Sequence, residues 1–337
     1  MTKARRLCIQ VALSVALLIV LIGLPLLIQN RYLVHVLIVT GMYCALALGY
    51  DLVVGHVGLL SLAHPTFFGV GAYAAAILST RVGTPFLVNF VVAGFVAAGL
   101  ASVVSFPFLR LAGASFAIGT LGFALIIQLV ANNEVWLTGG TNCTIGVARP
   151  RLTLGPWLDW RVSSVTDYYY LMLIILLLVV VLCWRLTTSR VGRAFISIRE
   201  DEILAMASGV NLLKYKTFAF VVGAFIAGSV GAYYAHYSTL ACPEDLANYM
   251  TTALLIILFL GGAGRMRGVV LGAIIFTFVP EFLRIAYTLR MVIFGALLLL
   301  AIVYMPEGLD GTLTKWLGKS PFSGTGAMSG GKEHGRE

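Results

Sequence analysis

Long apolar segments separated by short polar ones occupy almost the whole chain. Most of them have close to the ~20 residues that an α-helix needs to cross the hydrocarbon core of a bilayer. They do not alternate polar and apolar residues at every second position, as the strands of a membrane barrel do. The pattern therefore predicts about ten transmembrane or partly spanning helices, which we place at residues 7–29, 33–54, 60–80, 86–109, 114–132, 169–186, 215–239, 249–263, 268–287 and 291–306.

The composition narrows the fold class further. The chain is 60% hydrophobic and 11% charged, whereas a soluble domain carries about 25% charged residues. A soluble fold is therefore excluded, and the predicted fold class is an all-α polytopic membrane protein. Its transmembrane domain is expected to cover residues 1–315. The segment that follows, 316–337, is rich in Gly and Ser and is expected to be a disordered tail.

The basic residues indicate the orientation of the helices. The net charge is +9, and Lys and Arg gather mainly on one side of the predicted membrane. Because positive residues favour the cytoplasmic side, we expect loop 187–214, tail 316–337 and both chain ends there, with loop 133–168 outside as an ordered cap. The first apolar run is expected to be a retained span rather than a signal peptide. The charge thus reflects membrane topology and contact with lipid, and no nucleic-acid partner is expected.

The polar stretch from Ser189 to Lys216 is too elaborate for a simple turn. It carries several basic residues and an acidic run, Glu200–Glu202. Apolar residues recur between the charges at helical spacing, namely Phe195, Ile198, Leu204 and Ala205. We expect this stretch to contain a helix that contacts a partner in water. The alternative is a solvated amphipathic loop that lies on anionic lipid.

Segment 55–80 is less regular than the other predicted spans. It contains the candidate translocation-pathway residues Gly55, Gly58, His64, Pro65 and Gly69. Proline removes a backbone donor and opens a helix, and inside a membrane such a break persists only when it is buried in protein or lines a wet cavity. Two interpretations remain open: a broken helix beside a transport pathway, or a helix pair packed closely through small residues.

No pattern in the sequence indicates catalysis. Gly318-Lys319-Ser320 resembles the end of a phosphate-binding loop, but Leu313 stands where the motif requires glycine. The chain is therefore not expected to be an enzyme or to bind a cofactor, and active transport would draw its energy from a partner or from an ion gradient. The five cysteines have no metal-ligand spacing and are expected to be small apolar residues, with no metal site.

A carrier driven by an ion gradient usually has ionisable residues deep in the bilayer. The candidates here are few: His35, Asp51, His64 and Glu281. Asp51 and Glu281 are expected at span ends, where a side chain can reach the interface at low cost. The scarcity of deep ionisable residues counts against a gradient-driven carrier.

Four segments resemble the signature regions of branched-chain amino acid ABC transporter permeases of the LivM type. They are GYDLVVGHVGLLSLAHPTFFGVGAY, LTGGTNCTIGV, SRVGRAFISIREDEILAMASGVNLLKYK and FLGGAGRMRGVVLGA. They occur in the family's order, and the resemblance extends from about residue 40 to residue 310.

This resemblance implies an importer subunit in a bacterial inner membrane. The implied partners are a second permease of the LivH type, two ATPase subunits that bind ATP and Mg, and an external protein that delivers leucine, isoleucine or valine. Related permeases handle urea, short-chain amides or other amino acids, and these substrates remain an alternative. A secondary transporter without an ATPase is a further alternative.

The family also implies that loop 187–214 couples the chain to the ATPases. In such importers a cytoplasmic loop that resembles the EAA loop docks into a groove on the ATPase. Only Ala205 and Gly209 fit that motif here, because Ile203 and Leu204 replace the expected Glu and Ala and the nearest acid, Glu202, comes one place early. Small residues let a partner's surface approach the backbone. The expected coupling residues are Arg193, Arg199, Glu202, Ala205 and Gly209.

Overall fold

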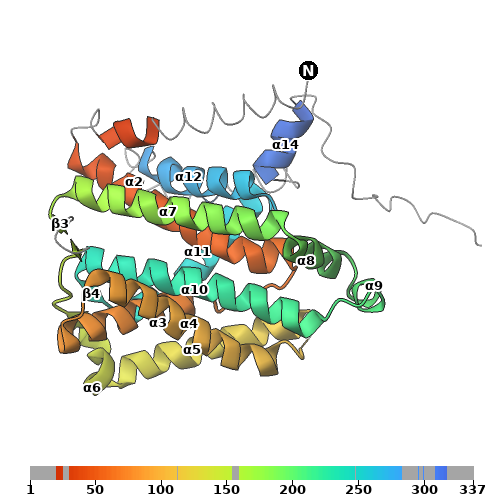
Figure 1. Cartoon of the computed structure of the whole chain (residues 1–337), viewed down its shortest axis with the longest axis horizontal. Helices are drawn as coiled ribbons and strands as arrows, with labels where there is room; N and C mark the ends of the chain where they lie inside the picture. Colours follow the sequence, from red (N-terminus) through yellow and green to blue (C-terminus); the bar gives the residue numbers. More distant parts are fainter. Residues whose placement is uncertain are drawn as a thin grey trace, which may run out of the picture.

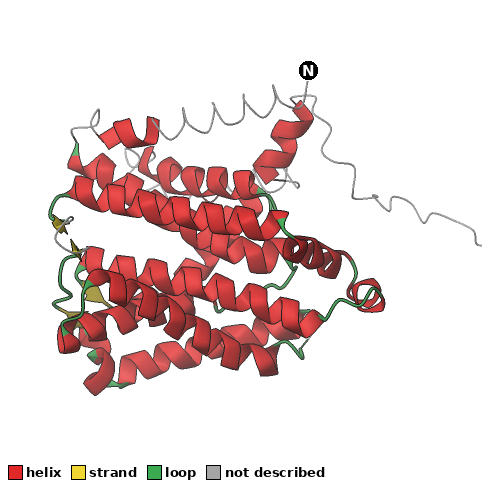
Figure 2. Cartoon of the chain, viewed as in Figure 1, coloured by secondary structure: helices red, strands yellow, loops and turns green. Residues whose placement is uncertain are grey.

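Helices lie side by side across the molecule, and the short strands are confined to one of its ends (Figure 2). The computed structural model describes residues 20–25, 30–111, 113–153, 159–246, 248–282, 295, 299 and 308–316. The predicted tail 316–337 lies almost wholly outside these residues. Helices α8 and α9 lie at the end of the bundle opposite to strands β3 and β4 (Figure 1).

The first half of the described chain runs through the following elements. They are α2 (Arg31–Asp51), a π-helical turn η1 (Leu52–His56), α3 (His64–Ile77), a second π-helical turn η2 (Leu78–Val82), α4 (Phe86–Phe108), α5 (Ala114–Asn133), α6 (Val135–Thr138), a 3-10 turn η3 (Gly140–Asn142), β1 (Thr144–Ile145), β2 (Arg151–Thr153) and β3 (Asp159–Arg161).

The second half contains the polar stretch and the remaining helices. Its elements are α7 (Val165–Thr188), α8 (Arg190–Glu200), α9 (Glu202–Ala207), α10 (Leu212–Ser238), β4 (Leu240–Ala241), a 3-10 turn η5 (Pro243–Leu246), α11 (Asn248–Gly261), α12 (Met266–Phe282) and α14 (Gly308–Trp316).

The helical membrane class is confirmed. Among the described residues, five helices are long and apolar enough to cross a membrane: Arg31–His56, Phe86–Phe108, Ala114–Asn133, Val165–Thr188 and Leu212–Ser238. The predicted number of about ten spans is not established. The spans predicted at 7–29 and 291–306 lie mostly outside the described residues, and Tyr249–Gly261 is a shorter apolar helix.

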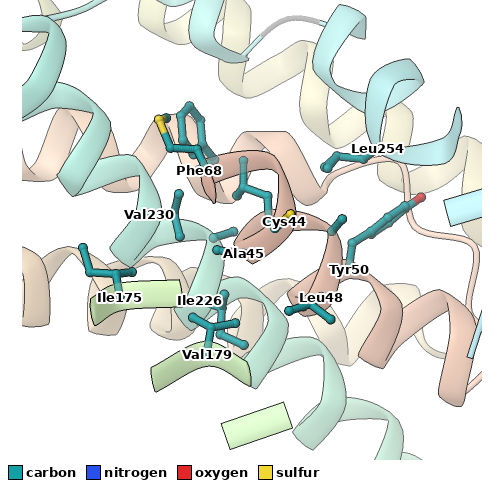
Figure 3. Close-up of a cluster of buried hydrophobic side chains, with 14 of the residues drawn as sticks. Cys44, Ala45, Leu48, Tyr50, Phe68, Ile175, Val179, Ile226, Val230 and Leu254 are labelled. Carbon is teal, nitrogen blue, oxygen red and sulfur yellow. The ribbon is translucent and has the colours of Figure 1, made fainter. Parts of the chain in front are cut away.

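The core forms where α2 passes between α7 and α10. Side chains of α2 such as Leu48 pack with Val179 of α7 and Ile226 of α10, and all three are buried (Figure 3). Helices α3 and α10 also approach each other closely. A Cβ atom added at Gly71 would collide with the backbone of Gly228. Close van der Waals packing, which the small residues at the contact allow, holds the helices together.

The break predicted in segment 55–80 lies at residues 57–63, which are not helical. The hydroxyl of Tyr50 donates to the carbonyl of Ser61 at 2.8 Å, and the N–H of Leu62 donates to Thr120 Oγ1 at 3.0 Å. These bonds satisfy backbone groups that lie inside the bundle. Pro65 stands in the first turn of α3, where no backbone donor is needed. Proline therefore begins a helix here rather than interrupting one.

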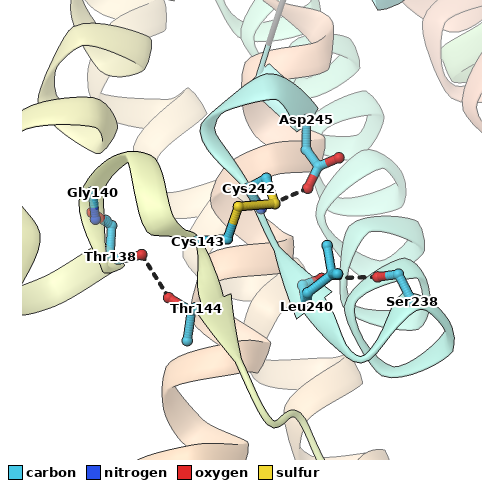
Figure 4. Close-up of a disulfide and its surroundings, with 8 residues drawn as sticks. All are labelled: Thr138, Gly140, Cys143, Thr144, Ser238, Leu240, Cys242 and Asp245. Atoms are coloured by element: carbon cyan, nitrogen blue, oxygen red, sulfur yellow. Dashed lines mark hydrogen bonds between the residues drawn. A yellow bond between two sulfur atoms is a disulfide. The ribbon is translucent and has the colours of Figure 1, made fainter.

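A disulfide joins Cys143 to Cys242 at the end of the bundle that carries the strands (Figure 4). Strand β1 pairs antiparallel with β4 beside it, with Thr144 opposite Ala241. Within the loop predicted at 133–168, the described residues form α6, η3 and three short strands. The prediction that all five cysteines are apolar fillers is wrong for this pair, although it holds for the buried Cys44 and Cys183. Cys8 lies outside the described residues.

Candidate functional site

The polar stretch from Ser189 to Lys216 forms two short helices that cover one end of the bundle (Figure 1). Ser189 caps α8 by accepting the N–H of Val191 at 3.1 Å. Phe195 and Ile198 turn inward and pack with Val57 and Ala219. Arg193 is exposed on the opposite face. One face of α8 is therefore anchored in the protein, and the other is presented to solvent.

Helix α9 is fixed at both of its ends. Asp201 accepts the N–H groups of Ile203 at 2.8 Å and Leu204 at 3.0 Å, which satisfies the first free donors of the helix. Gly209 ends the turn with a φ of +82°, a left-handed conformation that favours glycine. The carboxylate of Glu202 lies 2.7 Å from Lys216 Nζ of α10. Because of these contacts α9 has a defined position although it is short.

The coupling residues predicted on α9 face different ways. Ala205 is only 2% exposed and packs beside Phe195 and Ile198, so it supports α9 from inside instead of facing outward as expected. Gly209 is exposed, and a Cβ atom there would meet nothing within 4 Å. The outward apolar side chains are Ile203, Leu204 and Met206, which are 74%, 65% and 53% exposed. The helical spacing in the sequence groups Leu204 with Phe195, Ile198 and Ala205, but only Leu204 of these four residues is exposed.

Arg199 connects α8 to the end of α2. Its Nη1 donates to the carbonyl of Gly55 in the π-helical turn. Gly58 lies directly beneath the same side chain, where an added Cβ atom would be 3.3 Å from Arg199 Cγ. Gly55 and Gly58 were predicted to line a pathway and Arg199 to contact an ATPase, yet the structure brings the three together. A displacement of α8 would reach α2 through this contact.

The same junction includes the turn between α11 and α12. Asp51 Oδ1 accepts the backbone N–H of Gly264 at 2.7 Å, and Asp51 Oδ2 lies 3.3 Å from His56 Nδ1. Asp51 is 1% exposed, so the prediction that it reaches the membrane interface is wrong. A buried carboxylate needs such partners, because an unpaired charge is costly away from water. Gly55 has room for no side chain, because an added Cβ atom would collide with Asp51 and Gly264.

We call the group formed by Asp51, Gly55, Gly58, Arg199 and Gly264 the α2–α8 junction. Asp51 and Gly264 were not assigned to this site from the sequence. Two glycine-rich turns, 55–58 and 261–264, each follow an apolar segment, and this shared pattern could have indicated that the two turns meet.

The other predicted pathway residues form a separate buried group in α3. His64 is 2% exposed, and its ring lies 5.1 Å from that of Tyr50. Gly69 allows Leu246 of η5 to pack against α3. Pro65 begins the helix. Among the described residues, no three His, Cys, Asp or Glu side chains gather closely enough to hold a metal ion.

An apolar groove of about 710 Å³ lies beside the junction of α8 and α10. Val191, Leu213, Phe218 and Val221 line it, with Lys214 at its polar edge. This groove and the exposed face of α9 make the surface at the α8–α9 end of the bundle more apolar than that of an ordinary solvated loop.

Comparisons with known proteins identify the family of the chain. Residues 32–302 match the model of a family described as "Branched-chain amino acid transport system / permease component". The chain is 32% identical to the high-affinity branched-chain amino acid transport system permease protein LivM of Escherichia coli K12, over 88% of this chain and 73% of the relative. It is 28% identical to the corresponding LivH protein of Salmonella typhimurium, over 80% of this chain and 91% of the relative. No solved structure matches the chain significantly.

Proposed function

Because this chain belongs to the permease family of branched-chain amino acid transport systems, we propose that it forms one half of the membrane path of an importer driven by partner ATPases. It is a multi-pass membrane protein and a transport subunit. The relatives include both LivM and LivH proteins, which supports pairing with a second, homologous permease. The substrates proposed are leucine, isoleucine and valine.

The exposed face of α9 is the observation that carries the proposal. Ile203, Leu204 and Met206 are large apolar side chains in water on a helix that is fixed at both ends. Exposed apolar patches of this kind mark interaction sites. We propose that the ATPase subunit covers this face. Anionic lipid is the alternative occupant, but α9 carries Glu202 and follows Glu200 and Asp201, and these acidic residues disfavour it.

Coupling then passes through the α2–α8 junction. When the ATPase subunits close on ATP, they move α9 and α8 together, because Ala205 of α9 packs with Phe195 and Ile198 of α8 in one buried cluster. The hydrogen bond from Arg199 to the Gly55 carbonyl transmits this movement to the π-helical turn at the end of α2. The hydrogen bond between Asp51 and Gly264 then transmits it to the turn between α11 and α12. The helices reorient, and the substrate path changes its opening from one side of the membrane to the other. ATP can drive this change only by binding the two arrangements with different affinity.

The proposed orientation places α8 and α9 in the cytoplasm and the disulfide outside. Disulfides persist in oxidising compartments such as the bacterial periplasm and are rare in the cytoplasm. This supports the periplasmic assignment of the end with Cys143 and Cys242. The external end would receive substrate from a binding protein.

Purification at native expression tests this function against a self-sufficient secondary carrier. We expect two ATPase subunits and a second permease to co-purify with the chain, and leucine uptake by the reconstituted complex to require ATP and Mg. Uptake by this chain alone under a proton or sodium gradient would contradict the proposal. Uptake of urea or a short-chain amide in place of leucine would change the substrate but leave the ATP-driven mechanism intact.

A further inference from the structure

A cavity of about 230 Å³ lies between α2, α10, α11 and the turn η5. We call it the tyrosine pocket, and it is lined by His35, Val39, Met42, Tyr43, Leu46, Tyr234, Tyr237, Glu244, Asp245, Tyr249 and Met250. Pockets for drug-sized ligands measure about 300–1,000 Å³. This cavity is smaller and suits a single small metabolite.

The wall contributed by α2 changes from polar to apolar with depth. His35, Val39, Met42 and Leu46 follow one another on a single face of the helix. At a rise of 1.5 Å per residue, His35 and Leu46 are separated by roughly 16 Å along the axis. The pocket therefore has a polar outer part and an aliphatic inner part, as a small amphipathic ligand requires.

The outer part carries negative charge. Glu244 and Asp245 lie in η5, close to the disulfide, where Asp245 Oδ2 accepts the N–H of Cys242 at 2.8 Å (Figure 4). Glu244 is exposed and has no ion pair among the described residues. The pocket lining in the described chain includes no Lys or Arg. These features favour a cation at the outer part of the pocket.

The aromatic rings reinforce this preference. Tyr43, Tyr234, Tyr237 and Tyr249 line the pocket, and the faces of such rings attract ammonium groups. Their hydroxyls can also donate to a carboxylate. His35 Nδ1 lies 2.5 Å from the hydroxyl of Tyr237, which fixes the two side chains at the outer rim.

We propose that the tyrosine pocket binds the transported amino acid, with Glu244 and Asp245 on its α-ammonium group and with Val39, Met42 and Leu46 against its aliphatic side chain. This inference rests on the proposed function as an amino acid importer. It adds a site and a reason for selectivity, since urea and short-chain amides carry no ammonium group to pair with the two carboxylates.

Ligand protection of a single cysteine tests the pocket directly. Tyr249 is 69% exposed at the rim, so Tyr249→Cys introduces a reactive thiol there, combined with Cys8→Ser to remove another thiol. In the assembled complex without the binding protein, we expect leucine to slow maleimide labelling of this thiol several-fold. We expect 4-methylpentanoate, which lacks the ammonium group, and urea to have no such effect.

Charge removal gives the second arm of the experiment. In the Tyr249→Cys background, Glu244→Gln should raise the leucine concentration for half protection about two- to fivefold, as expected for a solvent-exposed ion pair. The double variant with Asp245→Asn, which still accepts the N–H of Cys242, should raise it about tenfold or more. Glu134→Gln is the matched control, because Glu134 is an exposed carboxylate at the end of α5 and outside the pocket.

Two failures have different meanings in this design. If leucine gives no protection in a complex that still imports leucine, or if 4-methylpentanoate protects equally well, the tyrosine pocket is overturned and the proposed function stands. If the unmodified complex imports no leucine with ATP, the proposed function itself is wrong.

Discussion

Asp51 accepts a hydrogen bond from the backbone N–H of Gly264 at 2.7 Å, although 213 positions separate the two residues in the chain. The bond joins the end of α2 to the turn between α11 and α12. Arg199 donates to the neighbouring carbonyl of Gly55, so three segments meet beside the buried Asp51 carboxylate.

Two substitutions of Asp51 distinguish the contribution of its charge to stability from that of its hydrogen bond with Gly264. Asp51→Ala leaves the Gly264 N–H without an acceptor and should cost about 1–3 kcal/mol. Asp51→Asn keeps an acceptor for Gly264 and removes only the negative charge beside His56 Nδ1, so it should be less destabilising. Thermal unfolding of the purified complex measures both variants. Equal stability of the wild type and Asp51→Ala would show that the contact contributes nothing.

Gly55→Ala should prevent normal packing of the junction. The added Cβ atom would collide with the Asp51 carboxylate and the Gly264 backbone, neither of which can move without breaking their mutual bond. Gly99→Ala in α4 is the matched control, since a Cβ atom there meets nothing within 4 Å and alanine favours the helix. The yield of monodisperse protein in size-exclusion chromatography should fall for Gly55→Ala and remain unchanged for Gly99→Ala.

Arg199→Ala should uncouple ATP hydrolysis from transport. The variant loses the contact with Gly55 but leaves the exposed face of α9 intact, so the ATPases should still bind and hydrolyse ATP. Leucine uptake per ATP hydrolysed should fall several-fold in proteoliposomes. Arg185→Ala is the matched control, because Arg185 is an exposed arginine near the end of α7 and lies outside the α2–α8 junction, so the ratio should stay unchanged. An unchanged ratio in Arg199→Ala would remove this residue from the coupling mechanism.

Leu204→Glu should prevent assembly with the ATPase. Leu204 is 65% exposed, so the substitution places a charge in the proposed interface without disturbing the interior. Thr188→Glu introduces the same charge at an exposed position at the end of α7. Affinity purification should recover the ATPase with Thr188→Glu and not with Leu204→Glu. Recovery with both variants would place the interface elsewhere.

Leucine binding to the tyrosine pocket should strengthen as pH rises through the pKa of the Asp245 carboxyl. Burial raises the pKa of the Asp245 carboxyl and nearby Glu244 raises it further, while hydrogen bonds from Cys242 and Tyr234 partly oppose the shift. The carboxyl is neutral below that pKa and cannot pair with an ammonium group. Protection of the Tyr249→Cys thiol, corrected for the intrinsic labelling rate at each pH, should therefore increase on deprotonation.

The pH response can be assigned by variants. Asp245→Asn should abolish the pH dependence of leucine binding. His35→Gln should leave that dependence unchanged, which would show that the histidine lining the same cavity does not cause it. The raised pKa of Asp245 also affects folding. The folded state binds the carboxyl proton more tightly than the unfolded state does, so the ligand-free protein should lose stability as pH rises through this pKa. A response that survives Asp245→Asn would contradict the assignment.

The long helices were predictable because each consists of an apolar run that is long enough to cross a membrane. Helices α4, α5, α7 and α10 begin and end within a few residues of the predicted bounds. The predicted span at 60–80 instead begins at His64, because residues 57–63 find hydrogen-bond partners inside the bundle. Such partners come from α2 and α5, and no local pattern in the sequence indicates them.

The details of the site were less predictable, since they depend on contacts between distant segments. Leu204 and Ala205 are neighbours in sequence, and helical spacing alone did not decide that only Ala205 turns inward. Gly55 and Arg199 were both recognised but assigned to different roles. Cys143 and Cys242 are 99 residues apart, and their pairing follows from the antiparallel contact of β1 with β4 rather than from their spacing.

In α9, the residues that hold the helix in place are different from those that face outward. The residues that hold it in place, Asp201, Ala205 and Gly209, are determined by capping, burial and a positive φ. The three outward side chains at 203, 204 and 206 take no part in those constraints. The partner-facing surface of α9 can therefore change at these three positions while the helix that presents them keeps its place.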